Sequence, residues 1–489
     1  LKDCGRIAEN VNDESLTLPP FRQKLKTAKE HTDMNLKVKA VLDPAFQPMS
    51  VLLRDYSAAV QAAKSQKLVV SIVRNQGYTS SYAMDVFADD TGHDEENIRV
   101  IERVVKTLLW IKGGYKIVIS GSKVIYDAIA EAYKVGGARD FDNDFMSGVY
   151  ERPFEVEYIE KAEDAPATHE AAAPVGRHLD GCRIGFDAGG SDRKVSAVVD
   201  GETVYSEEVI WHPKKNSDPH YHFDGILDAF KTAASKMPRV DAIGVSSAGV
   251  YIDNKAMVAS LFIEVPKTPE NFEFTKNIYL NAAKALDPNV PIEVANDGDV
   301  TALAGAMDLN DDSVLGIAMG TSEAGGYVDA SGNITGWLNE LAFVPVDANP
   351  DAMRDEWSGD VGCGVKYFSQ DAVIKLCPAA GIDLPEELTL AEKLKFVQNL
   401  QAQGAPRTRG IYETIGVYFG YEIAYYAMFY DIKHVLIMGR VTSGTGGVLL
   451  LAGAVILAIR LRGDKQDNAP EAATDAPKEQ ETPDAPEKE

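Results

Sequence analysis

Four short motifs between residues 183 and 447 contain the residue types that bind a nucleotide and move a phosphoryl group. They are Asp187-Ala188-Gly189-Gly190-Ser191, Asn296-Asp297-Gly298-Asp299, Gly320-Thr321, and a run containing Gly439, Gly444, Gly446 and Gly447. Glycines let a backbone approach phosphate oxygens closely, and a carboxylate can act as a general base. Each motif alone also fits a tight turn, a flexible loop or a helix cap. Their order predicts a nucleotide pocket closed from two sides, with one carboxylate aimed between them.

Apolar runs around these motifs predict the strands and helices that position them. In the first half we expect strands at Cys182–Phe186, Val195–Val199, Thr203–Ile210 and Ala242–Ser246, with a helix near Phe223–Lys236. In the second half we expect strands at Val314–Ala318, Gly325–Val328, Ile334 and Val435–Met438, with a helix at Gly410–Met428. A helix around Val300–Met307 separates the two halves. Two similar halves indicate a duplicated α/β architecture.

The residues before the first motif predict a further α/β unit. Leu68–Val73 is a buried-strand candidate, helical spacing follows over 97–109, and a strand at 115–120 leads through Gly121 into an Ala-rich helix. An acidic stretch rich in Ala and Pro, at 161–176, marks a domain boundary. We therefore divide the chain into an N-terminal α/β domain of unknown role at 1–160, a linker at 161–180, two lobes at 181–300 and 301–462, and a disordered acidic tail at 463–489.

The four motifs resemble the phosphate-1, catalytic, phosphate-2 and adenosine motifs of the actin-like/Hsp70/hexokinase ATPase superfamily. Within it, the chain is most similar to the ROK family of bacterial sugar kinases, repressors and uncharacterised proteins, over roughly residues 180–450. The resemblance implies the fold class: α/β, with a duplicated actin-like ATPase (ribonuclease H-like) fold of two lobes and an interlobe cleft, plus the N-terminal α/β domain. It leaves residues 1–175 unassigned.

The resemblance also implies roles for individual residues. Asp297 would take the proton from an attacking sugar hydroxyl, and Asp187 would hold Mg²⁺ through water. The expected sugar-binding residues are Asn296, Glu340, Ser247 and Gly249. The expected ATP-binding residues are Asp187, Gly189, Gly190, Ser191, Gly320, Thr321, Gly439, Gly444, Gly446 and Gly447. ATP and Mg²⁺ are therefore the expected cofactors, and a small-molecule sugar is the expected partner.

Three positions depart from the family pattern. Phe343 stands where sugar kinases of this family carry a His that contacts the sugar. The cysteine-rich zinc motif is reduced to Gly362-Cys363-Gly364, and because one thiolate cannot form a tetrahedral site, no zinc is expected. Glu323, after Ser322, stands where kinases continue with Gly. A carboxylate there would repel the phosphates unless it points away or faces Mg²⁺.

The motifs favour a ROK-like sugar kinase that transfers the ATP γ-phosphoryl group to a sugar hydroxyl. Two alternatives stay open for the same fold: a non-catalytic sugar or nucleotide sensor, and an ATP-driven conformational switch. The chain carries 74 acidic against 49 basic residues, a formal net charge of −25. This balance argues against a nucleic-acid partner, which needs clustered Lys and Arg. A homodimer stays open.

Cysteine content and apolar runs predict a cytoplasmic protein. Four cysteines in 489 residues show no close pairing, as in a reducing compartment, and no secretory signal opens the chain. Val448–Ile459 is a run of twelve apolar or Gly residues. As a helix it would span about 18 Å, short of the ~30 Å hydrocarbon layer. We interpret it as a buried helix with no membrane partner, and a tail anchor stays open.

Overall fold

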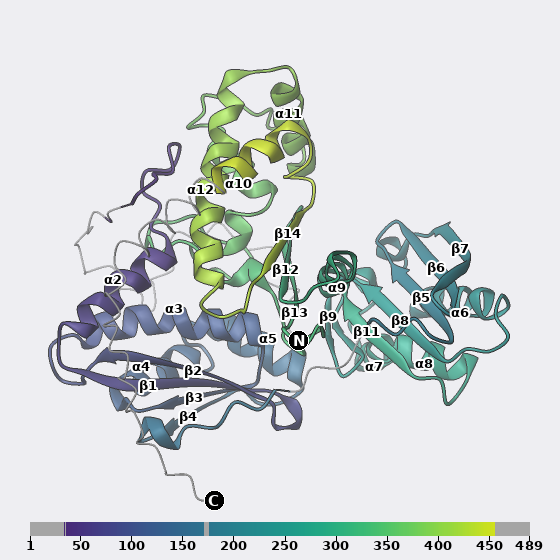
Figure 1. Ribbon diagram of the computed structural model, residues 1–489, viewed down its shortest axis with the longest axis horizontal. Helices are drawn as coiled ribbons and strands as arrows, with labels where there is room; N and C mark the ends of the chain where they lie inside the picture. The colour runs from purple at the N-terminus through teal and green to yellow at the C-terminus, as the bar shows by residue number, and fades with distance from the viewer. Residues whose placement is uncertain (1–33, 35, 171–175, 455–489) are drawn as a thin grey trace, which may run out of the picture.

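Residues 34, 36–170 and 176–454 are described by the computed structural model of the chain. Figure 1 shows three parts: an N-terminal domain in purple and blue at the lower left, a first lobe in teal at the right, and a second lobe in green above the N-terminal domain. The acidic tail at 463–489 and most of the first 35 residues lie outside the described residues, so the predictions made for them stay predictions.

The N-terminal domain is a four-stranded sheet with helices, and its strand order is β2-β1-β3-β4. β1 pairs antiparallel with β2 and β3, and β3 pairs parallel with β4. The elements are α2 (Met49–Gln61), β1 (Ser65–Val73), η2 (Asn75–Gly77), β2 (Thr79–Phe87), α3 (Asp94–Lys112), β3 (Lys116–Ser120), α4 (Lys123–Tyr133), α5 (Asp140–Tyr150), β4 (Glu155–Ile159) and η3 (Ala162–Asp164).

Lobe I is a five-stranded sheet of order β11-β8-β5-β6-β7, in which β5, β6 and β7 form an antiparallel meander and β8 and β11 run parallel to β5. Its elements are β5 (Cys182–Ala188), β6 (Asp192–Val199), β7 (Glu202–Ile210), η4 (Pro213–Lys215), α6 (Pro219–Ala234), β8 (Ala242–Ser247), β9 (Val250–Ile252), β10 (Lys255–Val258), η5 (Ser260–Phe262), α7 (Pro269–Lys276), α8 (Ile278–Leu286) and β11 (Ile292–Asn296). Side chains of α6 and α8, among them Phe230 and Tyr279, pack against the apolar face of this sheet.

Lobe II repeats the start of this arrangement. Its sheet has the order β13-β12-β14, with β13 antiparallel and β14 parallel to β12, as β6 and β8 are to β5. The place of a third meander strand is taken by an isolated bridge between Val328 and Ile334. The elements are α9 (Asp297–Leu309), β12 (Val314–Met319), β13 (Glu323–Val328), η6 (Leu341–Phe343), η7 (Gly364–Lys366), α10 (Gln370–Leu376), α11 (Leu390–Ala402), α12 (Pro406–Tyr426) and β14 (His434–Met438), followed by helical residues 444–454.

The duplicated α/β architecture predicted from the sequence is confirmed by this topology. The predicted strands and long helices of both lobes are present, except that Ile334 forms only a bridge. Apolar alternation explains the success for β5, where buried and half-buried residues alternate along the strand. β2 escaped prediction because Thr79-Ser80-Ser81 opens it with polar residues, and short helices such as α7 carry little periodic signal.

The N-terminal domain and lobe II share one hydrophobic core. A single cluster joins Leu68 and Trp110 of the N-terminal domain to Ile411 and Tyr418 of α12. The segment before α2 adds Phe46, whose ring centroid lies 4.6 Å from that of Tyr418. Burial on this scale couples the stability of the two parts. The N-terminal domain and lobe II therefore pack as one body. The linker at 161–180 stays a prediction.

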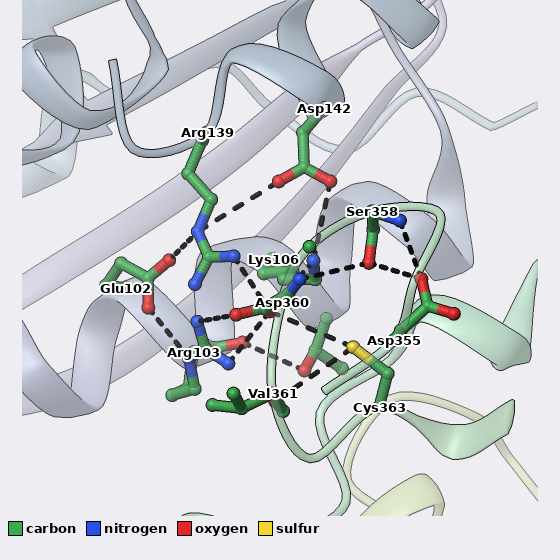
Figure 2. A network of polar contacts seen from close by, with 12 residues as sticks. Glu102, Arg103, Lys106, Arg139, Asp142, Asp355, Ser358, Asp360, Val361 and Cys363 are labelled. Atoms are coloured by element: carbon green, nitrogen blue, oxygen red, sulfur yellow. Dashed lines mark hydrogen bonds and ion pairs between the residues drawn. The ribbon is translucent and has the colours of Figure 1, made fainter. Parts of the chain in front are cut away.

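A buried network of ion pairs joins α3 and α5 of the N-terminal domain to the loop over 355–363 of lobe II (Figure 2). At its centre, the Asp360 carboxylate lies 3.0 Å from Arg103, 3.0 Å from Lys106 and 2.7 Å from Arg139. Two further buried carboxylates complete it, Glu102 on Arg103 and Arg139, and Asp142 on Lys106. Three acids thus balance three bases, as buried charges require.

The loop that carries Asp360 also contains Gly362-Cys363-Gly364, the segment that resembles a reduced zinc motif. Its Cys363 is fully buried, and burial raises the pKa of the thiol to about 12. The described residues contain no group of three or more His, Cys, Asp or Glu that could hold a metal ion. Ion pairs with Arg103, Lys106 and Arg139 fix this loop in place.

The apolar run at 448–459 is described only up to residue 454, where it is helical and packs on α12. Gly416 of α12 faces Gly453 so closely that an added Cβ would lie 3.2 Å from its Cα. Leu450 is buried, whereas Val448 is 67% exposed, so the helix is half-buried rather than fully buried. Among the described residues, no helix is long and apolar enough to span a membrane.

Candidate functional site

The β5–β6 turn carries the first predicted phosphate-binding motif. Trp211, after β7, holds this turn: its ring Nε1 donates to the Gly189 carbonyl at 2.7 Å, and its backbone N–H donates to the Ser191 carbonyl at 3.1 Å. A Cβ at Gly189 would lie 2.6 Å from the Asp192 carbonyl, so only Gly fits there. The turn is therefore a fixed backbone element at the end of β5, next to Asp187.

A lysine that the sequence analysis missed lies over this turn. Lys214 of η4 comes so close that its Nζ would be 3.3 Å from a Cβ placed on Gly190. Within the described residues, Lys214 makes no ion pair, whereas Lys194 is paired with Asp192 at 2.6 Å. Lys194 also lies 3.9 Å from Asp187. The sequence alone could not place Lys214 there, because its position depends on the segment after β7 folding back onto the β5–β6 turn.

The β12–β13 turn carries the motif compared with phosphate-2. Gly320 donates its N–H to the Ser322 carbonyl at 2.9 Å and accepts from the Gln370 N–H at 2.9 Å. Thr321 and Ser322 are exposed at the tip, and Glu323 turns the other way and is 2% exposed. The Glu323 carboxylate accepts from the Tyr426 hydroxyl at 3.2 Å. It therefore points into the core, away from where phosphates were predicted.

Replacing Glu323 by Gln should change how stability depends on pH. Burial raises the pKa of Glu323 from 4.5 to about 8. Because the folded state holds this proton more tightly than the unfolded chain, wild-type stability falls as pH rises between these values. Above pH 8, the free energy of unfolding of Glu323→Gln should therefore exceed that of the wild type by about 1–3 kcal/mol. Near pH 4.5 the two proteins should differ little. Urea unfolding at both ends of this pH range measures the difference. If the free energy of unfolding depended on pH equally in the variant and the wild type, the prediction would be wrong.

The glycines of the fourth motif serve packing. Gly439 follows β14 with φ +103°, a conformation that favours glycine, and lies against the Met319 backbone. A Cβ at Gly446 would lie 2.4 Å from the Tyr412 ring, and one at Gly447 would lie 1.8 Å from the Thr442 carbonyl. Gly444 has φ +73° and open space around it. These glycines let the helix at 444–454 begin six residues after the end of β14. Their contact with adenosine stays a prediction.

Asp297 is the first residue of α9, immediately after β11. Asn296 caps the helix, since its Oδ1 accepts from the Gly298 N–H at 2.7 Å and its Nδ2 donates to the Gly249 carbonyl at 2.7 Å. Asn296 thus engages the protein through both ends of its amide. Asp297 accepts only from the Gly298 N–H, at 3.0 Å, within the described chain. Burial, and to a smaller extent the charge of Asp187, raises the pKa of Asp297.

Asp187 and Glu340 both interact electrostatically with Asp297. Burial and the charge of Asp297 raise the pKa of Glu340, at the start of η6, to about 7. Asp187, at the end of β5, acts electrostatically on Asp297 in turn. Asp187 and Glu340, which are more than 150 residues apart in the chain, are therefore both within electrostatic range of Asp297. A half-buried carboxylate with a raised pKa is suited to accept a proton.

Asp299 is hydrogen-bonded to the turn that carries Glu340, a contact that the sequence did not reveal. It is 6% exposed, and its Oδ1 accepts from the Tyr327 N–H and from Asn339 Nδ2, both at 3.0 Å. The Tyr430 hydroxyl donates to Asn339 at 2.9 Å. Asn339 has φ +52° and immediately precedes Glu340. Asp299 therefore ties α9 to the turn that presents Glu340.

Two other predicted substrate residues, Ser247 and Gly249, lie at and just after the end of β8. Ser247, at the end of β8, is fully buried and shares a 3.0 Å hydrogen bond with the Tyr279 hydroxyl. Gly249 has φ +138°, and an added Cβ would lie 2.2 Å from the Val258 carbonyl. Phe343, compared above with a sugar-contacting His, is buried against the N-terminal domain, with its ring centroid 4.3 Å from that of Trp110. Sugar contact by Ser247 and Gly249 stays a prediction.

A cavity of about 380 Å³ lies where the N-terminal domain and both lobes meet. Gly249 and Asn296 line it from lobe I, Asp299 and Trp337 from lobe II, and Tyr78 from the N-terminal domain. None of the residues predicted to bind ATP lines this cavity. Of the four predicted substrate residues, Asn296 and Gly249 line this cavity, whereas Ser247 and Glu340 do not. Asp297 is not part of the lining, but it lies in the chain between Asn296 and Asp299, which are.

The chain is structurally similar to ROK-family proteins. It covers 89% of a ROK hexokinase from Thermus thermophilus at 17% identity, using 58% of its own length, with a TM-score of 0.45. It covers 89% of a ROK-family glucokinase from Streptomyces griseus, solved with glucose and AMPPNP, at 20% identity, using 57% of its own length, with a TM-score of 0.41. It covers 70% of a ROK-family transcriptional regulator, a homologue of the E. coli MLC protein, at 20% identity, using 58% of its own length, with a TM-score of 0.44.

These neighbours include both kinases and a regulator, so they do not decide between the two activities. No protein-family model matches the sequence, and no curated protein does. The fold assignment rests on the strand order and on the repeated start of the two lobe sheets.

Proposed function

We propose that the chain is an ATP-dependent kinase that phosphorylates a hydroxyl of a small sugar-like substrate, with Asp297 as the general base. The observation that carries the proposal is the position of Asp297 at the start of α9, where it accepts the Gly298 N–H and interacts electrostatically with Asp187 and with Glu340. In the proposed reaction, Asp297 receives the proton of the attacking sugar hydroxyl. Glu340 accepts a hydrogen bond from a neighbouring hydroxyl of the same sugar. Burial, with a smaller contribution from the charge of Asp187, keeps the pKa of the base raised, which suits proton transfer near neutral pH.

The β5–β6 turn supports the nucleotide part of the proposal. The space beside Gly190, which a Cβ would fill, is bounded by Lys214, and a backbone turn with a lysine is suited to phosphate oxygens. Asp187, whose side chain is 43% exposed, would hold Mg²⁺ through water. Bound there, Mg²⁺ would neutralise charge on the phosphates. Thr321 and Ser322, exposed on the β12–β13 turn, would donate hydrogen bonds from the other lobe.

ATP turnover with a panel of sugars tests the proposal directly. The panel contains hexoses, hexosamines and N-acyl hexosamines, and both ADP release and phosphosugar formation are measured. Turnover that depends on one class of sugar is the expected result. ATP binding without stimulation by any sugar would contradict the kinase proposal and favour the sensor or the conformational switch.

Lys214→Ala should weaken ATP binding. Removal of the ammonium from the β5–β6 turn should raise the KM for ATP about tenfold, the size expected for one charge-assisted hydrogen bond, and leave the sugar KM unchanged. The matched control is Lys236→Ala, because Lys236 is an exposed lysine of lobe I just beyond the end of α6. This variant should leave both KM values at their wild-type levels. An unchanged KM for ATP in Lys214→Ala would remove this lysine from the site.

A further inference from the structure

His222 of α6 is a fully buried histidine whose ring contacts two other segments of lobe I. Its Nε2 lies 3.0 Å from the carbonyl oxygen of Pro213 in η4 and 3.1 Å from that of Leu261 in η5. Its Nδ1 lies 3.2 Å from the Asp218 carbonyl oxygen, one turn earlier in the chain. Both ring nitrogens therefore face backbone oxygens, which can only accept hydrogen bonds.

These contacts indicate the protonation state of the ring. A neutral imidazole carries one N–H, so one ring nitrogen would turn a lone pair towards a carbonyl oxygen at 3.2 Å or less. The imidazolium carries an N–H on both nitrogens and can donate to all three oxygens. The aromatic rings of Phe262, Tyr221 and Trp211 lie around it, with centroids 5.1, 5.6 and 6.3 Å away. Because aromatic faces attract cations, these neighbours also favour the charged ring.

His222 contacts both supports of the β5–β6 turn. One support is Trp211, whose hydrogen bonds hold the turn and whose ring packs edge-to-face against the His222 ring. The other is η4, where buried Pro213 accepts from His222 and the next residue, Lys214, lies over Gly190. The position of Lys214 therefore depends on a buried hydrogen bond one residue earlier in the chain.

We propose that His222 is a positioning residue for the phosphate end of the nucleotide site, and that its doubly protonated ring keeps Lys214 over the β5–β6 turn. This assignment rests on the proposed nucleotide binding and adds regulation of that site by pH. When the ring loses its second proton, one of its nitrogens can no longer donate to a carbonyl oxygen, and η4 is held less firmly. Affinity for ATP therefore falls as the pH rises through the titration of the ring.

The charged groups around His222 are of both signs, and η5 carries none. The Asp218 carboxylate interacts electrostatically with His222 and supports the charged ring. Two exposed lysines of η4 oppose it. The titratable side chains on the elements packed against the ring are Asp218, His220 and Tyr221 of the α6 start, with His212, Lys214 and Lys215 at η4.

Calorimetric titration of MgATP into the full chain tests the pH dependence, between about pH 5 and about pH 9, where histidine side chains change charge. His222→Gln keeps an N–H donor that does not titrate. The dissociation constant of wild type relative to His222→Gln should rise about three- to tenfold across this range, as expected for one lost hydrogen bond. This ratio cancels the titration of ATP itself. His220→Gln, in an exposed histidine of the same helix turn, is the matched control and should behave as wild type.

His222→Phe tests the route through Lys214. It keeps a planar ring and removes both donors, so it should weaken ATP binding about tenfold at low pH, as Lys214→Ala does. In a Lys214→Ala background, His222→Phe should add little further loss, because the two residues act through one contact. Hydrogen exchange without nucleotide supplies a second readout. The backbone amides of 211–218 should exchange faster in His222→Phe than in wild type or His220→Gln.

The outcomes separate this inference from the nucleotide proposal. Faster exchange at 211–218 in His222→Phe, with no ATP binding by wild type, would support the positioning of η4 and contradict the nucleotide site. Unchanged exchange, or wild-type ATP affinity in His222→Phe, would overturn the role of His222. A full additional loss in the Lys214→Ala background would overturn the route through Lys214. The same pH dependence in wild type and His222→Gln would overturn the regulation, and this comparison decides the proposal if His222→Phe does not fold.

Discussion

Asp297→Asn should lower kcat for sugar-dependent ATP turnover by about 10²–10⁴-fold, the usual contribution of a general base. Asn keeps the size of the side chain and can still accept from the Gly298 N–H, so the start of α9 is preserved. It cannot take up the hydroxyl proton. ATP binding and the KM for the sugar should change little, because the loss falls on the chemical step.

The matched control for this prediction is Asp308→Asn, an exposed acid near the end of the same helix. It should keep wild-type kcat and the same unfolding midpoint as Asp297→Asn. A second readout is the pH profile: the acidic limb of kcat, which reports the raised pKa of Asp297, should disappear in Asp297→Asn. Full turnover in Asp297→Asn would show that another group takes the proton.

Asp360→Asn should destabilise the protein by about 3–5 kcal/mol, the cost of breaking a buried ion pair from one side. The substitution leaves Arg103, Lys106 and Arg139 buried with one acid too few (Figure 2). Burial alone would raise the pKa of Asp360, but Arg103 and Lys106 hold it well below its ordinary value, so the carboxylate stays charged. Urea unfolding at neutral pH measures the loss.

Two further variants separate charge from packing in this network. Asp351→Asn, an exposed acid nearby on the same segment, should leave stability unchanged. Adding Lys106→Met to Asp360→Asn removes one unpaired cation and should recover part of the lost free energy. If Asp360→Asn unfolded with the wild-type midpoint, the network would not join the two parts energetically.

Two of the three positions that depart from the resembled family's pattern lie at the contact between the N-terminal domain and lobe II. Phe343 packs on Trp110, and the loop with Cys363 is fixed by ion pairs to α3 and α5, so both lie where the N-terminal domain contacts lobe II. Glu323 points into the core towards Tyr426.

Short-range pattern in the sequence determined the elements and the order of the motifs. Alternating apolar residues identified β5, and the Asn296-Asp297 pair after β11 identified the capped start of α9, because both signals come from neighbouring residues. Only the tertiary structure placed Lys214 over Gly190, Asp299 against Asn339, and Gln76 against Asp253. These contacts join residues far apart in the chain, and their side-chain types carry no local signal of a partner. The sequence therefore determined which residues could do chemistry, and the tertiary structure decided which of them lie near one another.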